Sequence, residues 1–348
     1  MNDASLSPRT SQRAECGIET HIALLPDINA LQAHQAPWFA LWREVADATP
    51  FQAPAWLLCW ALHYAPDRTG AIAATAGGKW LAALPYFIWN GVVWLAGTGV
   101  SDYGDALVGP RATGLSDALL EALAGVAHEN DCRRIDLRQL RPDSPLLSAA
   151  TPAVWRSEIM PGEPCMALPL HGAEGLGEVS RRWRRNIAYA QRRLGRAGAW
   201  TLQRVPADDA AQAAEVLRRL HERRWNARNE PSGLFADPLL RDFLRDVIPR
   251  LGSASLLRMY TLELDQRPIA TTFAMRAPGA TYFYATGFDP AWSRCSPGLL
   301  SIAAAIRGAA DEGDRTLHFL RGREGYKHHL GASEHATCRR VLRRTESH

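Results

Sequence analysis

The sequence LLRMYTLEL-DQR-PIATTFAMR-APG-ATYFYATGF, residues 256–288, decides the fold. Three runs rich in β-branched and aromatic residues are separated by two turn-forming tripeptides, which predicts three antiparallel strands. After a loop over residues 289–298, the apolar run 299–312 ends at Gly313 and predicts a helix. Residues 315–320 predict a fourth strand. The predicted unit is therefore a meander, a crossover helix and one more strand.

Length and composition limit the possible classes of protein. The chain has 348 residues, long for one domain and comfortable for two, and its net charge of +4 does not require a nucleic acid or a membrane as partner. Six cysteines without metal or disulfide spacing indicate a reducing compartment, and residues 1–20 lack the apolar core of a signal peptide, so we expect a cytoplasmic protein. The most apolar run, residues 80–100, contains Asn90-Gly91, a hairpin signal that favours two strands over a membrane span.

The first half of the chain repeats the order of the second. Its predicted elements are a disordered tail over 1–20, a strand over 22–25, helices over 31–46 and 54–64, strands over 71–76, 79–89 and 92–96, a polar loop over 97–109, a helix over 116–130 and a strand over 134–140. The first meander turns, at Gly77 and Asp265, lie 188 residues apart, and so do the second, at Asn90 and Pro278. This spacing predicts two copies of one αβ domain.

The remaining segments complete the predicted division into domains. Residues 143–163 are irregular and mark the junction, so we expect an N-terminal domain over 21–165 and a C-terminal domain over 166–348. The second domain adds a basic helix over 179–196, a strand over 200–205, a helix over 207–228, a loop over 229–233 and a helix over 237–248. The fold class is α+β in layers, with two mixed, mainly antiparallel sheets flanked by helices.

The basic helix has two possible roles. Its apolar stripe carries Trp183, Ile187 and Leu194, and arginines such as Arg184 and Arg185 fall on the other side without acidic partners at i,i+4. A solvated face is one interpretation. The other is an anion-binding face for a cofactor phosphate, an acidic glycan or an RNA backbone.

The predicted architecture resembles the GNAT N-acyltransferase fold, and two such domains in tandem resemble the FemABX-type group. Short motifs are similar to those of its CelD-like branch, named from cellulose biosynthesis: FQAPAWL (51–57), SDY (101–103), RRN (184–186), SPGLL (296–300) and GREGYK (322–327). His318 departs from the family pattern, which usually has an acidic residue there. The loop before the crossover helix keeps Arg294 and Gly298 of the acyl-CoA loop but not its full pattern.

The loop that enters the crossover helix is the predicted cofactor site. Free N–H groups and the helix dipole at such an N-terminus suit a pyrophosphate, and a glycine allows close approach. The candidate residues are Arg294, Ser296, Pro297, Gly298 and Leu299. An ordinary helix-entry turn is the alternative.

The end of the last strand carries the candidate catalytic residues. The resemblance places an acid tyrosine at Tyr326, where a phenol can protonate the leaving thiolate. Glu324 is the candidate base or acceptor-orienting group, Lys327 steers an anion, and Asp289 is a second base candidate. The alternative for Glu324 and Lys327 is a structural ion pair. No His, Cys or carboxylate spacing indicates a metal site.

Candidate substrate-binding residues are Asp102, Tyr103, Arg184, Arg185 and Arg321. For Asp102 the alternative is an Asp-rich turn that bonds its own backbone. The resemblance implies an acyltransferase that uses acetyl-CoA or another acyl-CoA and no metal, with an amine or hydroxyl of an amino sugar or polysaccharide precursor as acceptor. Two further possibilities are an aminoacyl-tRNA-dependent FemABX-type transferase and a non-catalytic accessory protein of polysaccharide biosynthesis.

Overall fold

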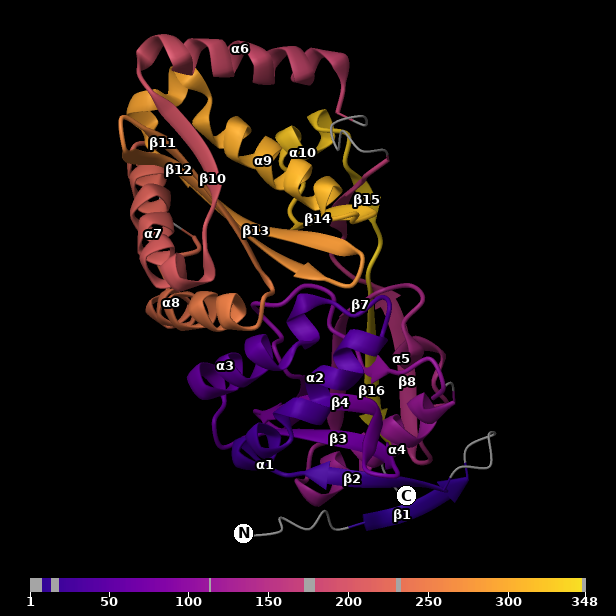
Figure 1. The fold of residues 1–348 in the computed structure, drawn as a ribbon. Helices are drawn as coiled ribbons and strands as arrows, with labels where there is room; N and C mark the ends of the chain where they lie inside the picture. The colour runs from indigo at the N-terminus through magenta and orange to yellow at the C-terminus, as the bar shows by residue number, and fades with distance from the viewer. Residues whose placement is uncertain (1–7, 14–18, 113, 172–178, 230–232, 346–348) are drawn as a thin grey trace. The chain divides into compact units, whose positions relative to one another are not determined.

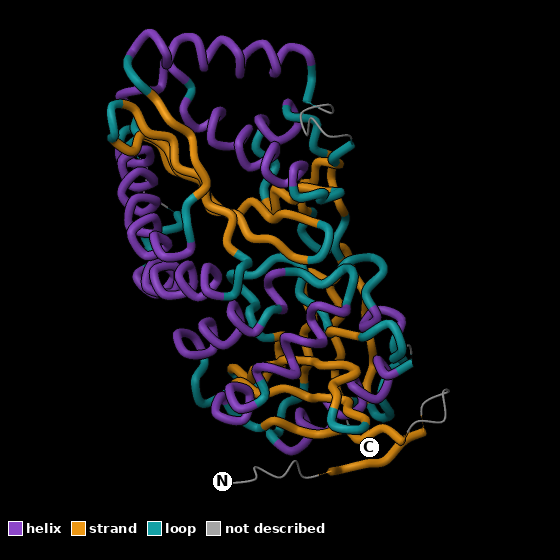
Figure 2. Tube along the Cα trace, in the orientation of Figure 1, coloured by secondary structure: helices purple, strands orange, loops and turns teal. Residues whose placement is uncertain are grey.

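The computed structural model describes residues 8–13, 19–112, 114–171, 179–229 and 233–345 (Figure 1). The chain divides into two compact units, one formed by the residues up to Glu163 together with those from Ala336 onward, the other by Pro164–His335. Each unit is built on one sheet flanked by helices (Figure 2). The α+β class expected from the sequence is confirmed.

The first unit contains a nine-stranded sheet in the order β1-β2-β3-β4-β5-β7-β16-β8, with β6 paired to β4. Its strands are β1 (Pro8–Arg13), β2 (Glu19–Leu25), β3 (Thr69–Ala76), β4 (Lys79–Trp89), β5 (Val92–Leu95), β6 (Leu107–Val108), β7 (Arg134–Leu140), β8 (Trp155–Pro161) and β16 (Cys338–Arg344). Its helices are α1 (Ile28–Ala33), α2 (Gln35–Glu44), the 3₁₀ helix η1 (Pro50–Gln52), α3 (Pro54–Tyr64), α4 (Leu115–Glu129) and α5 (Pro145–Ser148). The leucines of α4, among them Leu119 and Leu123, are buried against β3 and β4.

The second unit contains a seven-stranded sheet in the order β10-β11-β12-β13-β14-β9-β15. Its strands are β9 (Cys165–Pro169), β10 (Trp200–Arg204), β11 (Leu257–Leu264), β12 (Arg267–Ala277), β13 (Ala280–Phe288), β14 (Thr316–Arg321) and β15 (Ser333–His335). Its helices are α6 (Arg181–Ala197), η2 (Ala207–Asp209), α7 (Ala210–Asn226), α8 (Pro238–Ser253), η3 (Pro290–Cys295), α9 (Pro297–Asp311) and α10 (Gly325–His329). In Figure 1, α9 packs on one face of β11–β13 and α7 packs on the other.

Both units use the same sequence of elements. In the first, the antiparallel strands β3, β4 and β5 lead through α4 to β7, which runs parallel to β5. In the second, β11, β12 and β13 lead through α9 to β14, which runs parallel to β13. The meander, crossover helix and closing strand predicted from residues 256–320 are thus present in each unit.

Several local expectations differ from the structure. Residues 143–163, expected to be irregular, contain α5 and β8, and β8 pairs with β16. Residues 8–13, expected in a disordered tail, form β1 by antiparallel backbone pairing with β2. The single helix expected over 31–46 is two helices that meet at His34, whose ring nitrogen Nδ1 lies 2.8 Å from the carbonyl oxygen of Ala30. The polar loop expected over 97–109 contains the two-residue strand β6. In each case a backbone pairing or a local side-chain contact is involved that residue periodicity does not reveal.

The C-terminal strand returns to the first unit, although the sequence analysis assigns residues 166–348 to one C-terminal domain. β16 pairs with β7 on one side and with β8 on the other. Arg340 is buried there and donates hydrogen bonds to the carbonyl oxygens of Leu146 (2.6 Å) and Ala149 (2.8 Å) and to the hydroxyls of Thr151 and Ser157. This pairing joins residues almost 200 positions apart, a separation that local patterns do not encode.

We expect Arg340→Ala to lower the free energy of unfolding by about 3 kcal/mol, because two buried carbonyl oxygens lose their donor. Arg343→Ala is the matched control on the same strand, since its side chain is exposed and makes one 3.3 Å ion pair with Glu158. The control should change stability by less than about 1 kcal/mol. Urea denaturation of both variants measures the difference, and equal small effects would show that β16 does not depend on this residue.

Candidate functional site

The candidate site lies where the parallel strands β13 and β14 separate. These parallel strands pair only through Ala280, Thr281 and Tyr282. From Phe283 to Phe288, no described strand lies along that side of β13, so a row of backbone N–H and C=O groups is left without a strand partner. His318, at the last paired position of β14, stacks on Tyr282 with ring centroids 4.6 Å apart.

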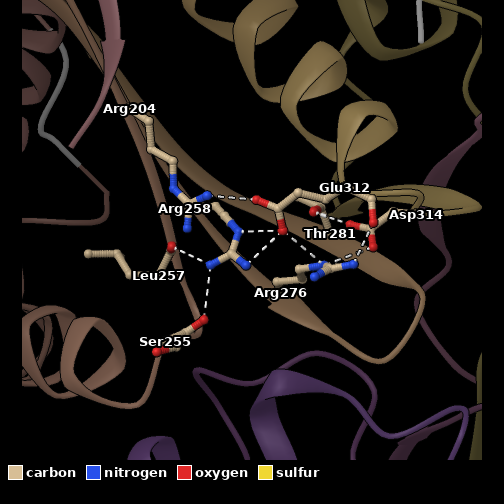
Figure 3. Close-up of polar contacts among 8 residues, drawn as sticks. All are labelled: Arg204, Ser255, Leu257, Arg258, Arg276, Thr281, Glu312 and Asp314. Atoms are coloured by element: carbon tan, nitrogen blue, oxygen red, sulfur yellow. Dashed lines mark hydrogen bonds and ion pairs between the residues drawn. The ribbon is translucent and has the colours of Figure 1, made fainter. Parts of the chain in front are cut away.

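A cluster of charges fixes the far end of α9 (Figure 3). Each of the four strands β10–β13 sends one side chain to the two acids that follow the helix. Arg204 and Arg258 donate to Glu312, at 2.8 and 2.7 Å, and Arg276 and Thr281 donate to Asp314, at 2.9 and 2.7 Å. The helix is thereby tied to the whole antiparallel part of the sheet.

Both acids are partly withdrawn from water, with different results. Burial alone would raise the pKa of Glu312, but the hydrogen bond from Arg258 and the charges of three arginines hold it below its usual value. Burial raises the pKa of Asp314, because its contacts with Thr281 and Arg276 offset desolvation only in part. The cluster therefore anchors α9 and leaves the opposite end of the helix to present its N-terminus.

The five predicted cofactor residues lie together at that N-terminus. Ser296 adopts a left-handed conformation, with φ of 48°, and its carbonyl oxygen accepts the N–H groups of Leu299 and Leu300. No acceptor for the N–H of Gly298 is found among the described residues, and Arg294 is exposed and makes no ion pair with any of them. A free N–H and an unpaired cation at a helix N-terminus are what an anion needs.

Gly298 also permits a close approach. A Cβ atom at this position would lie 3.0 Å from Cδ1 of Phe288, the last residue of β13. The aromatic ring therefore lies directly on the first turn of α9. A larger residue at this position would have to push the Phe288 ring aside, whether or not a ligand is bound.

Lys327 and Glu324 form the ion pair that the sequence analysis leaves as the structural alternative. Lys327 is buried, 3 % exposed, and its Nζ donates to the carbonyl oxygens of Arg321 (2.7 Å) and Gly322 (3.1 Å) and contacts Glu324 at 2.9 Å. All three N–H donors of the ammonium thus have a partner. The geometry gives Lys327 a positioning task at the end of β14, while Glu324 remains 57 % exposed.

Tyr326 is half-buried and meets Phe319 edge-on, with ring centroids 6.1 Å apart. Burial raises the pKa of its phenol, the negative charge of Glu324 raises it further, and the charge of Arg224 opposes both. The phenol is therefore protonated throughout the physiological range. A protonated side chain is the state that a proton donor must have.

Arg224 interacts with the residues around Tyr326, and the sequence did not lead us to expect it there. Its guanidinium lies 5.0 Å from the centre of the Phe288 ring, and it interacts electrostatically with Tyr326 and Glu324. Leu217, Leu220 and Arg224 are spaced i, i+3 and i+7, so the pattern of the predicted helix already places this arginine on the apolar side. A charge on the buried side of a helix is the signal that would have found it.

Asp289 is fully engaged elsewhere. One carboxylate oxygen accepts the N–H of Ala291, which caps η3, and the other meets Arg223 at 2.8 Å. These contacts suit a helix cap rather than the base that the sequence analysis considers.

The predicted substrate-binding residues are distributed over different parts of the chain. Asp102 and Tyr103 lie inside the first unit, 5 % and 2 % exposed, in a loop whose Ser101 hydroxyl accepts a hydrogen bond from the Trp56 indole. Arg184 and Arg185 are exposed on α6. Arg321 is half-buried at the end of β14. Arg321 therefore lies next to the Lys327 turn, Arg184 and Arg185 lie on another helix of the second unit, and Asp102 and Tyr103 belong to the first unit.

Asp105 is a second residue that the sequence analysis does not use. It is buried in the first unit, where Oδ1 accepts the Ser144 hydroxyl and the Ala106 N–H, both at 2.8 Å, and Oδ2 has no partner among the described residues. Burial raises its pKa to about 7, and the contacts with Ser144, Arg141 and Ala106 oppose that rise only in part.

A cavity of about 230 Å³ opens between β10, β11 and α7, and none of the predicted site residues lines it. The described residues contain no group of three or more potential metal ligands and no helix long and apolar enough to cross a membrane.

Residues 181–328 match the family model described as an acetyltransferase (GNAT) domain. This segment contains α6 and the complete cluster around Arg224, Gly298 and Tyr326.

Solved structures share the fold across both units. A crystal structure of FemX is 11 % identical, covers 89 % of this chain and 95 % of its own, and superimposes with a TM-score of 0.64. A conserved protein of unknown function from Bacteroides thetaiotaomicron is 12 % identical over 92 % of this chain and 99 % of its own, with a TM-score of 0.55.

The C-terminal domain of a putative lysylphosphatidylglycerol synthetase from Agrobacterium fabrum is 14 % identical over 75 % of this chain and 80 % of its own, with a TM-score of 0.53. No protein of curated function matches the sequence significantly. The chain thus has two units with the same order of meander, crossover helix and closing strand, and the second contains the segment that matches the acetyltransferase model.

We expect Asp105→Asn to stabilise the protein at pH 8 by roughly 5–10 °C in Tm and to stabilise it clearly less at pH 5, where the carboxyl of the folded protein is still protonated. A carboxyl whose pKa is higher in the folded state than in the unfolded state stabilises folding below its unfolded pKa. That contribution is lost as the pH rises toward 7, because the folded protein must then bury a charge.

Thermal unfolding from pH 5 to pH 8 measures this effect. Asp143→Asn, which changes an exposed carboxyl, is the control and should show no such dependence. Stabilisation by Asp105→Asn that is as large at pH 5 as at pH 8 would contradict the expectation.

Proposed function

We propose that this protein is an acyltransferase that moves an acyl group, acetyl in the first instance, from acyl-CoA to an amine or hydroxyl. The observation that carries the proposal is the combination of parted parallel strands, β13 and β14, with a free helix N-terminus at Gly298. Both lie inside the segment that matches the acetyltransferase model.

The residues at this end of the second unit fit an acyl-CoA. Its pyrophosphate would be held by the N-terminus of α9 and by Arg294, and Ser296, Pro297 and Leu299 shape that turn. The unpaired edge of β13 offers hydrogen-bonding groups for the amides of the pantetheine arm. When bound, the cofactor supplies a thioester.

The protein's own side chains would then donate a proton to the departing thiolate and accept one from the acceptor. Tyr326 is the proposed donor to the departing thiolate, because its phenol is protonated at neutral pH and lies on the turn that follows β14, beside Glu324 and Lys327. Glu324 is the proposed group that receives or orients the acceptor, because more than half of its side chain is exposed and Lys327 fixes its position. Lys327 acts as a positioning residue through Glu324 and the turn after β14.

The acceptor and the setting are proposed from the family resemblance. An amino sugar or a polysaccharide precursor fits a CelD-like protein, and the five described cysteines are all free thiols, which supports a cytoplasmic location. In this proposal Asp102 and Tyr103 would serve the first unit's fold, since both are buried.

We expect acetyl-CoA to raise the melting temperature of the purified protein, because a ligand at a hundred times its Kd adds about 2.7 kcal/mol of stability. Arg294→Glu should weaken acetyl-CoA binding about tenfold or more, since it places a negative charge beside the phosphates. Arg250→Glu is the control, because Arg250 is also exposed and makes no ion pair with any described residue, but lies on α8. Equal affinities in the two variants would contradict the assignment of Arg294.

A second candidate is transfer from an aminoacyl-tRNA. The observation that favours it is the outer face of α6, where seven arginines make no ion pair with any described residue: Arg181, Arg182, Arg184, Arg185, Arg192, Arg193 and Arg196. Several of these arginines are spaced i,i+3 or i,i+4, so their charges repel one another. The first turn of α6 contains no acidic residue that would offset this repulsion. A polyanion would relieve this repulsion.

We expect an RNA bound to this face to dissociate steeply with salt, with a slope of log K against log salt of about −0.7 for each phosphate contact on a single strand. The double variant Arg185→Gln/Arg192→Gln should reduce the slope, whereas Arg219→Gln/Arg250→Gln should not. Filter binding of total tRNA between 50 and 200 mM salt, about the range over which such contacts weaken strongly, makes the measurement. Absence of RNA binding at low salt would exclude this candidate, and if acetyl-CoA also failed to bind, a non-catalytic accessory protein would remain.

A further inference from the structure

Arg224 is a cation in the second unit without a counter-ion. Its Nε atom is completely buried and has no hydrogen-bond acceptor among the described residues. No described carboxylate forms an ion pair with its guanidinium, which lies 5.0 Å from the centre of the Phe288 ring.

The carboxylates of Glu324 and Asp289 already form ion pairs with other residues. Glu324, which interacts electrostatically with Arg224, is paired with Lys327 at 2.9 Å, and Asp289 is paired with the neighbouring Arg223 at 2.8 Å. Burial lowers the pKa of Arg224, and the like charge of Arg228 lowers it further. A partly buried, unpaired charge lowers stability, so the fold gains nothing from this guanidinium while it stays without an anion.

We propose that Arg224 binds a carboxylate of a substrate at the acyl-transfer site, carried either by the acyl group or by the acceptor. This inference rests on the proposed acyl transfer. Phe288 connects Arg224 to the helix N-terminus at Gly298, and Tyr326, the proposed proton donor, is one of the groups whose charge Arg224 senses.

A carboxylate fits this position better than a phosphate does. A planar guanidinium and a planar carboxylate form two parallel hydrogen bonds, and one such pair neutralises both charges. The aromatic rings of Phe288 and Tyr326 give the Arg224 guanidinium partly apolar surroundings. Such surroundings strengthen a charge-assisted hydrogen bond between Arg224 and a carboxylate. The exposed arginines at the start of α9 and on α6 are the residues suited to a solvated phosphate.

The experiment compares ligands that differ only in the carboxylate. Calorimetric titration of succinyl-CoA and butyryl-CoA tests a carboxylate on the acyl group. Thiol release from acetyl-CoA with paired acceptors, each an amino acid and its carboxamide, tests one on the acceptor. Both arms use wild type, Arg224→Met and, as a control on the exposed side of the same helix, Arg219→Met.

We expect wild type and Arg219→Met to prefer the carboxylate in one of the two arms by about 10- to 100-fold, the value of a charge-assisted hydrogen-bond pair. Arg224→Met should reduce that ratio to about one. Its melting temperature without ligand should be equal to that of wild type or higher, since an unpaired cation is removed and methionine still packs on an aromatic ring.

Four results would overturn the inference. If acetyl-CoA binds but wild type shows no preference for the carboxylate ligand in either arm, the proposed acyl transfer is retained and carboxylate binding by Arg224 is rejected. An equal loss of affinity for succinyl-CoA and butyryl-CoA in Arg224→Met would place the cofactor phosphates on this residue. A marked drop in melting temperature of that variant would make Arg224 structural. If no CoA thioester binds to any variant, the proposed acyl transfer fails together with the inference.

Discussion

Two carboxylates, Glu312 and Asp314, hold the second unit in its arrangement, because four neighbouring strands each send a side chain to them. A buried ion cluster of this kind adds little net stability, since desolvation offsets most of the attraction. It does fix which strand lies beside which and how α9 crosses them. The helix can then present its first turn where β13 and β14 separate.

Charges at the candidate site fall into two groups. In the first group, every N–H donor of the Lys327 ammonium and both carboxylate oxygens of Asp289 contact other residues of the protein. These contacts hold the turn after β14 and the turn after β13 in place. Arg224 and Arg294 have no such partners among the described residues. Because an unpaired charge contributes nothing to folding, the second group is where binding is expected. The same distinction separates the paired arginines around Asp136 on β7 from the unpaired arginines of α6.

Much of the site could be predicted from local sequence. Turn tripeptides and β-type runs located β11–β13 to within one or two residues, and a glycine before an apolar run located the start of α9. Sequence also brought Glu324, Tyr326 and Lys327 to the end of β14. It could not decide between an active and a structural Lys327, because that depends on the carbonyl oxygens of Arg321 and Gly322, which only the closed turn brings within reach.

The sequence by itself determined the α+β class, the repeated order of elements and the position of the helix entry loop, because periodicity and turn chemistry act over a few residues. The tertiary structure alone decided three things: the return of β16 to the first sheet, the burial of Asp102 and Tyr103, and the meeting of Arg224 with Phe288 and Tyr326. Each joins residues dozens to hundreds of positions apart. Such contacts form because separate elements must bury their apolar faces against one another, and a local pattern holds no record of which partner that will be.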